Sequence, residues 1–157
     1  MKNIKTGEKA PIFSASDQDG NIVSLESFRG RRVILYFYPR DNTPGCTAQA
    51  CSLRDGRDDL AAMGFTVLGV SPDNVSSHNK FRTKHDLNFT LLSDPDKTIA
   101  NAYGVWGEKK FMGKTVTGIR RTTFVIDENG MIEKIFDKVD TKNHWQQIAD
   151  SYIENKK

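Results

Sequence analysis

The stretch from residue 33 to residue 70 decides the fold: VILYFYPRDNTPGCTAQACSLRDGRDDLAAMGFTVLGV. It holds two apolar runs rich in β-branched and aromatic residues, Val33–Tyr38 and Phe65–Val70. Continuous runs of this kind are typical of strands that are buried on both faces of a sheet. The sequence therefore predicts two buried strands at residues 33–38 and 65–70.

The segment between these runs has the end signals of a helix over residues 44–63. Thr43 is a favourable N-cap residue, and Pro44 suits the first helical position. Gly64 stands where a glycine commonly follows the end of a helix. The stretch as a whole therefore predicts a strand, a helix and a second strand in succession.

Strands and helices continue to alternate along the rest of the chain. The expected elements are a helix from Asp73 or Ser76 to about 84, a strand at 89–92, a helix at about 95–103, a hairpin of strands 122–126 and 132–136 around a turn at 127–131, and a helix at about 142–154. This order predicts an α/β fold with a mixed central sheet, largely parallel with an antiparallel edge, and helices on both faces. Thioredoxin-like folds have this shape, and other three-layer α/β arrangements also fit the order.

Length and composition limit the classes of protein that need to be considered. The chain has 157 residues and a formal net charge of +3, so we expect a single domain over residues 1–157 and no nucleic-acid partner. No apolar run approaches the roughly 18 residues of a membrane helix. Residues 1–9 lack the apolar core of a secretory signal, so we expect a cytoplasmic, reducing location.

Two cysteines, Cys46 and Cys51, are the candidate reactive groups. Two thiols cannot form an all-cysteine zinc site, and the scattered histidines (His78, His85 and His144) show no ligand spacing toward them. The cysteines and histidines therefore do not predict a zinc site. Closely spaced cysteines in a reducing compartment are more often catalytic or redox-active than structural.

Cys46 falls in the first turn of the predicted helix, at the carboxyl end of a buried strand. Ligand sites in open α/β sheets lie at that edge. The first-turn N–H groups have no intrahelical partner, and together with the helix dipole they favour the thiolate, which is the nucleophilic form. The alternative is that Cys46 is a small buried hydrophobic residue.

Cys51 follows five residues later on the same predicted helix. In an intact helix the two Cα atoms would be roughly 8.6 Å apart, whereas a disulfide needs them within about 7 Å. Any bridge between Cys46 and Cys51 therefore requires the start of the helix to unwind. The alternative is that Cys51 is a packing residue that never meets Cys46.

The motif Pro39-x-x-x-Thr43-x-x-Cys46 resembles the peroxidatic motif of the peroxiredoxins. The second cysteine five residues on is similar to that of the bacterioferritin comigratory protein, or peroxiredoxin Q, group. Three further stretches support the resemblance: Gly7–Phe13, Gly104–Lys110 and Gly118–Asp127. The resemblance covers about residues 5 to 150 and implies a thioredoxin-like fold.

The resemblance implies an atypical two-cysteine, thioredoxin-dependent peroxidase for hydrogen peroxide and organic hydroperoxides. Cys46 would be the peroxidatic cysteine and become a sulfenic acid, and Cys51 would then form an intrachain disulfide with it. Thioredoxin or a similar dithiol would restore both thiols, and no metal or organic cofactor would be needed. An intrachain bridge does not require a dimer, and members of this group are often monomers.

The resemblance also assigns the residues around Cys46. Thr43 would position the peroxide and the sulfur through its hydroxyl, and Pro39 would shield the pocket from water. Arg121 would stabilise the thiolate and the charge on the leaving oxygen. Backbone N–H groups of Gly45 and Cys46 would complete the peroxide site.

Three other functions remain open on the residues alone. A disulfide oxidoreductase of thioredoxin type needs C-x-x-C, whereas this chain has C-x-x-x-x-C. A redox sensor or relay, which passes its oxidation to a partner protein, would use the same two cysteines. A thioredoxin-like binding module would leave both thiols unused.

Overall fold

The computed structural model describes residues 4–154, which form a central sheet, five α-helices, one 3-10 helix and a separate hairpin. The strands of the sheet are β1 (Ser14–Ser16), β2 (Ile22–Ser24), β3 (Arg32–Phe37), β4 (Phe65–Ser71), β5 (Thr90–Ser93), β8 (Thr122–Ile126) and β9 (Ile132–Phe136). The helices are η1 (Leu25–Phe28), α1 (Pro44–Asp55), α2 (Arg57–Ala62), α3 (Val75–Lys84), α4 (Thr98–Ala102) and α5 (His144–Glu154). The hairpin consists of β6 (Trp106–Phe111) and β7 (Lys114–Ile119).

The seven strands of the sheet have the order β2-β1-β5-β4-β3-β8-β9. The mixed sheet is confirmed, but the expectation of a largely parallel sheet is wrong. Only β3 with β4 and β4 with β5 run parallel, and the other pairs are antiparallel. The β8–β9 hairpin places β8 antiparallel beside β3, so the start of β8 lies next to the carboxyl end of β3.

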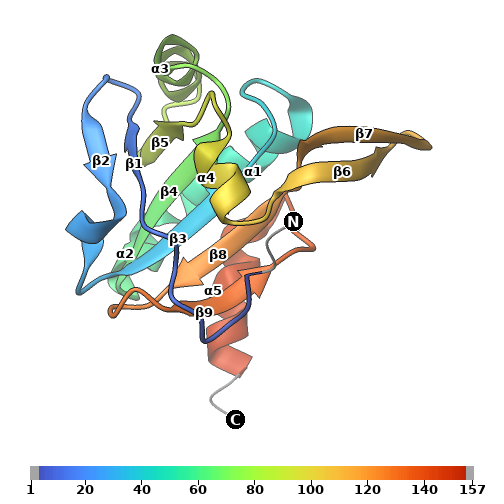
Figure 1. Ribbon diagram of the computed structural model, residues 1–157. Helices are drawn as coiled ribbons and strands as arrows, with labels where there is room; N and C mark the ends of the chain where they lie inside the picture. Colours follow the sequence, from blue (N-terminus) through green and yellow to red (C-terminus); the bar gives the residue numbers. More distant parts are fainter. Residues whose placement is uncertain (1–3, 155–157) are drawn as a thin grey trace.

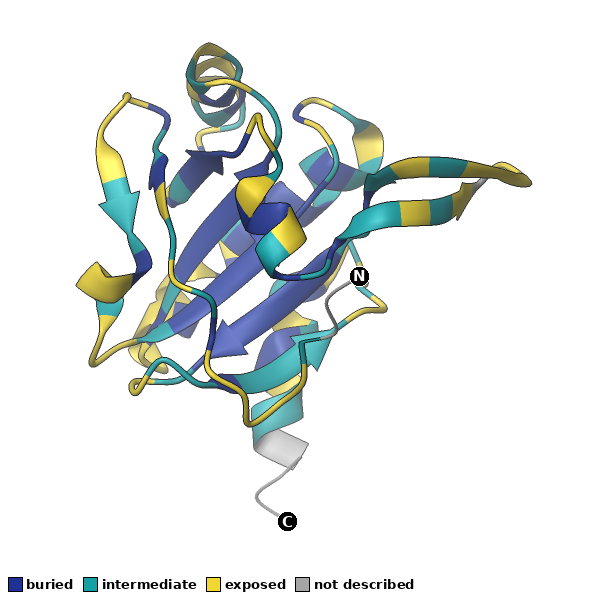
Figure 2. Cartoon of the chain, viewed as in Figure 1, coloured by how far each residue is buried: buried dark blue, intermediate teal, exposed yellow. Residues whose placement is uncertain are grey.

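The sheet separates two buried clusters, one on each face. Alternate residues of β3 contribute to each cluster, as the two-residue period of a strand requires. Val33, Leu35 and Phe37 pack on the face that α4 covers. Ile34 and Tyr36 pack on the opposite face with side chains of α1, α2, α3 and α5. Figure 2 shows the resulting buried central strands with exposed elements around them.

The helix expected over residues 44–63 is broken at Gly56 into α1 and α2. A Cβ atom at Gly56 would lie 2.1 Å from Cγ of Trp145, on α5. The close approach of this indole ring requires a residue without a side chain. The sequence signals at Thr43, Pro44 and Gly64 predicted the two ends of this helical region and gave no sign of the break.

We expect Gly56→Ala to lower the free energy of unfolding by about 3 kcal/mol, because the added methyl group overlaps the ring of Trp145. Gly64→Ala is the matched control, since it has open space around it and loses about 1–2 kcal/mol only through its left-handed backbone. Urea unfolding of both variants measures the difference. Equal losses would contradict the close contact at Gly56.

Several boundaries differ from the expected ones. The cap of α3 is Asn74, whose side chain accepts a hydrogen bond from the backbone N–H of Ser77, rather than Asp73 or Ser76. Helix α4 covers only Thr98–Ala102, because its preceding residue Lys97 has a left-handed backbone. No helix in the described range 4–154 is both long enough and apolar enough to cross a membrane.

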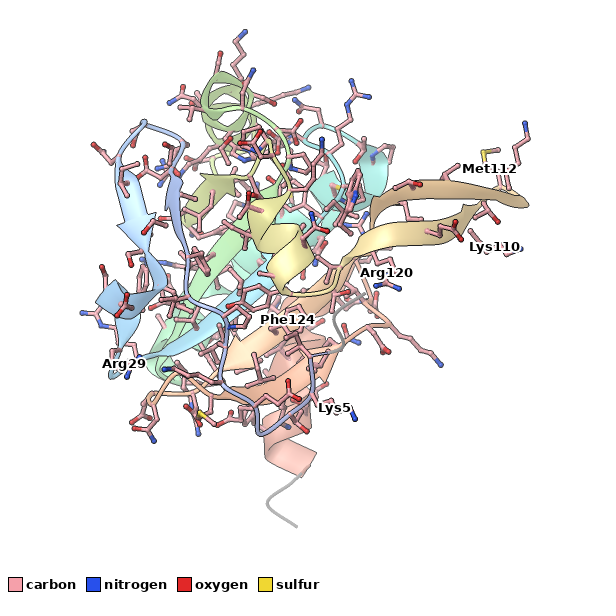
Figure 3. The ribbon with its side chains drawn as sticks, viewed as in Figure 1. Lys5, Arg29, Lys110, Met112, Arg120 and Phe124 are labelled. Carbon is pink, nitrogen blue, oxygen red and sulfur yellow. The ribbon has the colours of Figure 1, made fainter. Side chains whose placement is uncertain are left out.

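The sequence predicts no strands at residues 106–119, where the structure has the hairpin of β6 and β7. It extends away from the sheet at the end of the molecule where α1 begins (Figure 1). Lys110 and Met112 lie toward its tip, and Met112 is 86% exposed (Figure 3). Arg120 follows the base of the hairpin, where its guanidinium donates to the carbonyl oxygen of Gly104.

Candidate active site

Cys46 is the third residue of α1 and lies beyond the carboxyl end of β3, as expected. The backbone N–H of Thr47 donates to the carbonyl oxygen of Thr43 at 2.8 Å. The N–H groups of Gly45 and Cys46 precede this bond and have no acceptor within the helix. They form the positive end of the helix dipole at the base of the Cys46 side chain. This thiol is 1% exposed.

The guanidinium of Arg121 faces Cys46. Its Nη2 atom lies 3.2 Å from Sγ of Cys46, although the two residues are far apart in sequence. Arg121 directly precedes β8, whose first residue pairs with Phe37 at the end of β3, and this pairing brings the arginine to the start of α1. A Cβ atom at Gly45 would lie 3.2 Å from the same Nη2 atom, so Gly45 leaves room for the guanidinium.

Gln49 orients this arginine and was not identified in the sequence analysis. Its Oε1 atom accepts a hydrogen bond of 2.6 Å from Nη1 of Arg121. Gln49 lies one helical turn after Cys46, so both side chains project from the same part of α1 toward Arg121. The signal in the sequence was its spacing of three residues from Cys46, which by itself does not distinguish it from a packing residue.

Thr43 occupies the cap position of α1 with an extended backbone, as expected, but its side chain does not cap the helix. Its hydroxyl donates to the carbonyl oxygen of Arg40 at 2.9 Å instead. The proton of the hydroxyl is therefore directed away, and its oxygen lone pairs remain available as acceptors. Pro39 is half-buried and begins the turn that connects β3 to this cap.

Cys51 lies on the same intact helix as Cys46 and is half-buried. Both thiols are free, and no disulfide joins them. The structure therefore has the helical arrangement in which the two sulfurs cannot bond.

Burial and charge together set the electrostatics of the site. Burial raises the pKa of Tyr36 well above its usual range, and the nearby Cys46 adds to that effect. Burial lowers the pKa of Lys109 on the hairpin, and the positive charge of Arg121 lowers it further. Lys109 and Arg121 line the same pocket of about 530 Å³. Cys46 does not line this pocket, but both cationic groups lie near enough to it to interact with its charge.

One cluster of side chains has the residue types of a metal site: Asp41, Asp73 and His78. Each offers one possible ligand atom, and these atoms lie within 4.8 Å of one another. These atoms already bond within the protein. Nδ1 of His78 lies 2.8 Å from Oδ2 of Asp41, and the backbone N–H of Asp41 donates to Oδ2 of Asp73. Neither cysteine belongs to the group.

Comparison with known proteins gives the class of this protein. The model of the AhpC/TSA family matches residues 6–135. The chain is 53% identical over 144 residues to peroxiredoxin Bcp of Escherichia coli K12, with 92% of each chain covered. The chain belongs to the AhpC/TSA family and is a peroxiredoxin, which is a thiol peroxidase.

Comparison with solved structures identifies the group of peroxiredoxins to which this chain belongs. The bacterioferritin comigratory protein of Xanthomonas campestris, described for its alkyl peroxide reduction activity, is 30% identical with a TM-score of 0.86, and 98% of this chain and 100% of that chain are covered. A cysteine-to-serine mutant of Xylella fastidiosa peroxiredoxin Q is 27% identical with a TM-score of 0.90, and both chains are covered completely. These matches confirm the thioredoxin-like fold and the bacterioferritin comigratory protein, or peroxiredoxin Q, group.

Proposed function

We propose that Cys46 is the peroxidatic cysteine of this peroxidase. The observation that carries the proposal is its buried sulfur at the start of α1, 3.2 Å from Nη2 of Arg121. The thiolate attacks the nearer oxygen of the peroxide and the O–O bond breaks. The sulfur becomes a sulfenic acid, and the leaving oxygen takes a proton to give water or an alcohol.

The neighbouring groups stabilise the charges in this step. The N–H groups of Gly45 and Cys46 and the guanidinium of Arg121 face the thiolate and the oxygen on which negative charge develops. The hydroxyl oxygen of Thr43 accepts from the proton of the bound hydroperoxide, because its own proton is held by Arg40. Pro39 excludes water from the same pocket.

Cys51 acts as the resolving cysteine. The first turns of α1 unwind, the Cys51 sulfur bonds to the Cys46 sulfur, and the hydroxyl of the sulfenic acid leaves as water. This step breaks the contact of Arg121 with Cys46, which the structure shows with α1 intact. The cycle is therefore a repeated local unfolding and refolding of one helix end.

A dithiol protein then reduces the intrachain disulfide by exchange, and its own two thiols become a disulfide. Thioredoxin is the reductant that we propose, with a monomer in the reducing cytoplasm as the working form. Hydrogen peroxide and organic hydroperoxides are the proposed substrates. The alkyl peroxide reduction activity named for the Xanthomonas campestris relative supports the second class.

Stopped-flow mixing of the reduced protein with hydrogen peroxide tests this scheme, with Cys51→Ser beside the wild type. Trp145 packs against Gly56 at the end of α1, so tryptophan fluorescence should report movement of that helix. We expect a fast second-order phase in both proteins. A slower unimolecular phase should occur only in the wild type, since it requires Cys51.

Thiol counting after each phase provides the control for silent fluorescence. Oxidation no faster than that of free cysteine would contradict the assignment of Cys46. A wild type that forms a disulfide with a partner protein before Cys51 reacts would instead favour the redox relay.

A further inference from the structure

The residue Asp41 points away from the peroxide site although it belongs to the loop that builds it. Its side chain is 1% exposed. Tyr38 donates its hydroxyl to Oδ1 at 2.6 Å, and Ser77 donates its hydroxyl to Oδ2 at 2.8 Å. Nδ1 of His78 lies 2.8 Å from Oδ2. The carboxylate therefore contacts Tyr38, which directly follows β3, and two residues of α3.

His78 continues this network to the next strand. Its Nε2 atom lies 3.0 Å from the carbonyl oxygen of Leu92 on β5. A carbonyl oxygen only accepts, so Nε2 carries a proton and donates it to Leu92. The imidazole, which is completely buried, thus joins the loop to β5 across the end of the sheet.

The loop between Asp41 and Thr43 has a sharp turn. Asn42 has φ of 61°, which is the left-handed region, and it is an exposed residue. The turn directs the side chain of Asp41 into the interior and brings Thr43 to the start of α1. The backbone N–H of Asp41 is also held, by Oδ2 of Asp73 at 2.7 Å. Asp41 is therefore fixed two residues before Thr43, while the helix after Thr43 is the part that unwinds.

We propose that Asp41 and His78 are positioning residues for the peroxidatic site. They fix the loop of residues 39–43 so that Pro39 and Thr43 keep their places around Cys46 each time α1 unwinds and reforms. The inference rests on the proposed role of Cys46. It assigns a function to a buried cluster that the chemistry at the sulfur does not itself use.

Two variants of His78 separate positioning from simple loss of a buried hydrogen bond. The amide nitrogen of an asparagine side chain occupies about the place of Nδ1, whereas that of glutamine occupies about the place of Nε2. His78→Asn therefore retains the link to Asp41 and loses the one to Leu92. His78→Gln retains the link to Leu92 and loses the one to Asp41. Each variant loses one buried hydrogen bond, so a fall in Tm is expected in both.

The peroxide reaction should distinguish the two variants. His78→Gln is expected to slow the second-order oxidation of Cys46 by about 10-fold or more, since displacement of a catalytic group by about 1 Å costs on the order of 100-fold. His78→Asn should stay close to the wild-type rate. Stopped-flow mixing with hydrogen peroxide, together with thermal melts, measures both. Equal oxidation rates in the two variants would overturn the proposal.

Ser77→Ala keeps the proposal testable if neither His78 variant folds. It removes one donor from Oδ2 of Asp41 at a half-buried position, and a smaller fall in the same oxidation phase is expected. An unchanged rate in Ser77→Ala would overturn the role of the network. A wild type without a fast phase would contradict the role of Cys46 instead, so the two failures are distinguishable.

Discussion

We expect Cys46→Ser to abolish peroxide reduction and to leave the fold in place. A serine hydroxyl fits the same buried position, but it stays protonated and is a weak nucleophile without an adjacent base. Loss of an enzyme's nucleophile lowers the rate by about 10⁴-fold or more. Consumption of hydrogen peroxide in the presence of excess dithiol measures this loss, and a thermal melt checks the fold.

Cys51→Ser is the matched control, because it removes the other thiol of the same helix. In a single turnover without dithiol it should oxidise Cys46 as the wild type does and stop at the sulfenic acid, since no intrachain disulfide can form. Single-turnover and multiple-turnover measurements separate the two variants. If Cys46→Ser still consumed peroxide while Cys51→Ser did not, the nucleophile would be Cys51 and the proposed roles would be reversed.

The buried strands could be predicted because each carries its own signal. The apolar runs of β3 and β4 are continuous, and the turn between β8 and β9 has a strong hairpin composition. By contrast, β1 contains only three residues, Ser14–Ser16, and pairs with β5 at a single position. No periodicity exists over so short a length, so its strand conformation depends on neighbours that are distant in sequence.

The hairpin of β6 and β7 could not be predicted from the sequence, for a different reason. Its sequence, from Trp106 to Ile119, is rich in lysine and glycine, because much of the ribbon is exposed. A strand that buries little of either face has no reason to alternate apolar and polar residues. Its polar composition therefore resembled that of a loop.

Only the part of the site that depends on neighbouring residues in the chain could be predicted from the sequence. The position of Cys46 follows from the end of β3 and the start of α1, which are adjacent in the chain. The contact of Arg121 with Gln49 joins residues 72 apart, and that of His78 with Asp41 joins residues 37 apart. Arg121 came from the family resemblance, and neither Gln49 nor the Asp41–His78 pair has a local pattern that reveals its partner.

We expect Arg121→Lys to lower the second-order rate of Cys46 oxidation by about 100-fold, which is the lower end of the loss when one donor to a developing oxyanion is removed. The guanidinium makes two directed contacts at once, with Sγ of Cys46 at 3.2 Å and with Oε1 of Gln49 at 2.6 Å. An ammonium is a point charge on a shorter and more flexible chain, so it cannot hold both contacts in a fixed plane. The fall in rate therefore measures the contribution of the guanidinium's orientation, since lysine retains the positive charge.

Arg120→Lys is the matched control for this experiment. Its guanidinium donates to the carbonyl oxygen of Gly104 rather than to either group on α1, so its oxidation rate should stay close to that of the wild type. Gln49→Leu should fall between the two, because Arg121 then keeps its charge near the sulfur and loses its orienting partner. If Arg121→Lys reacted as fast as Arg120→Lys, orientation of the guanidinium would have no part in the rate. The helix N-terminus, with the free N–H groups of Gly45 and Cys46, would then have to stabilise the thiolate and the leaving oxygen unaided.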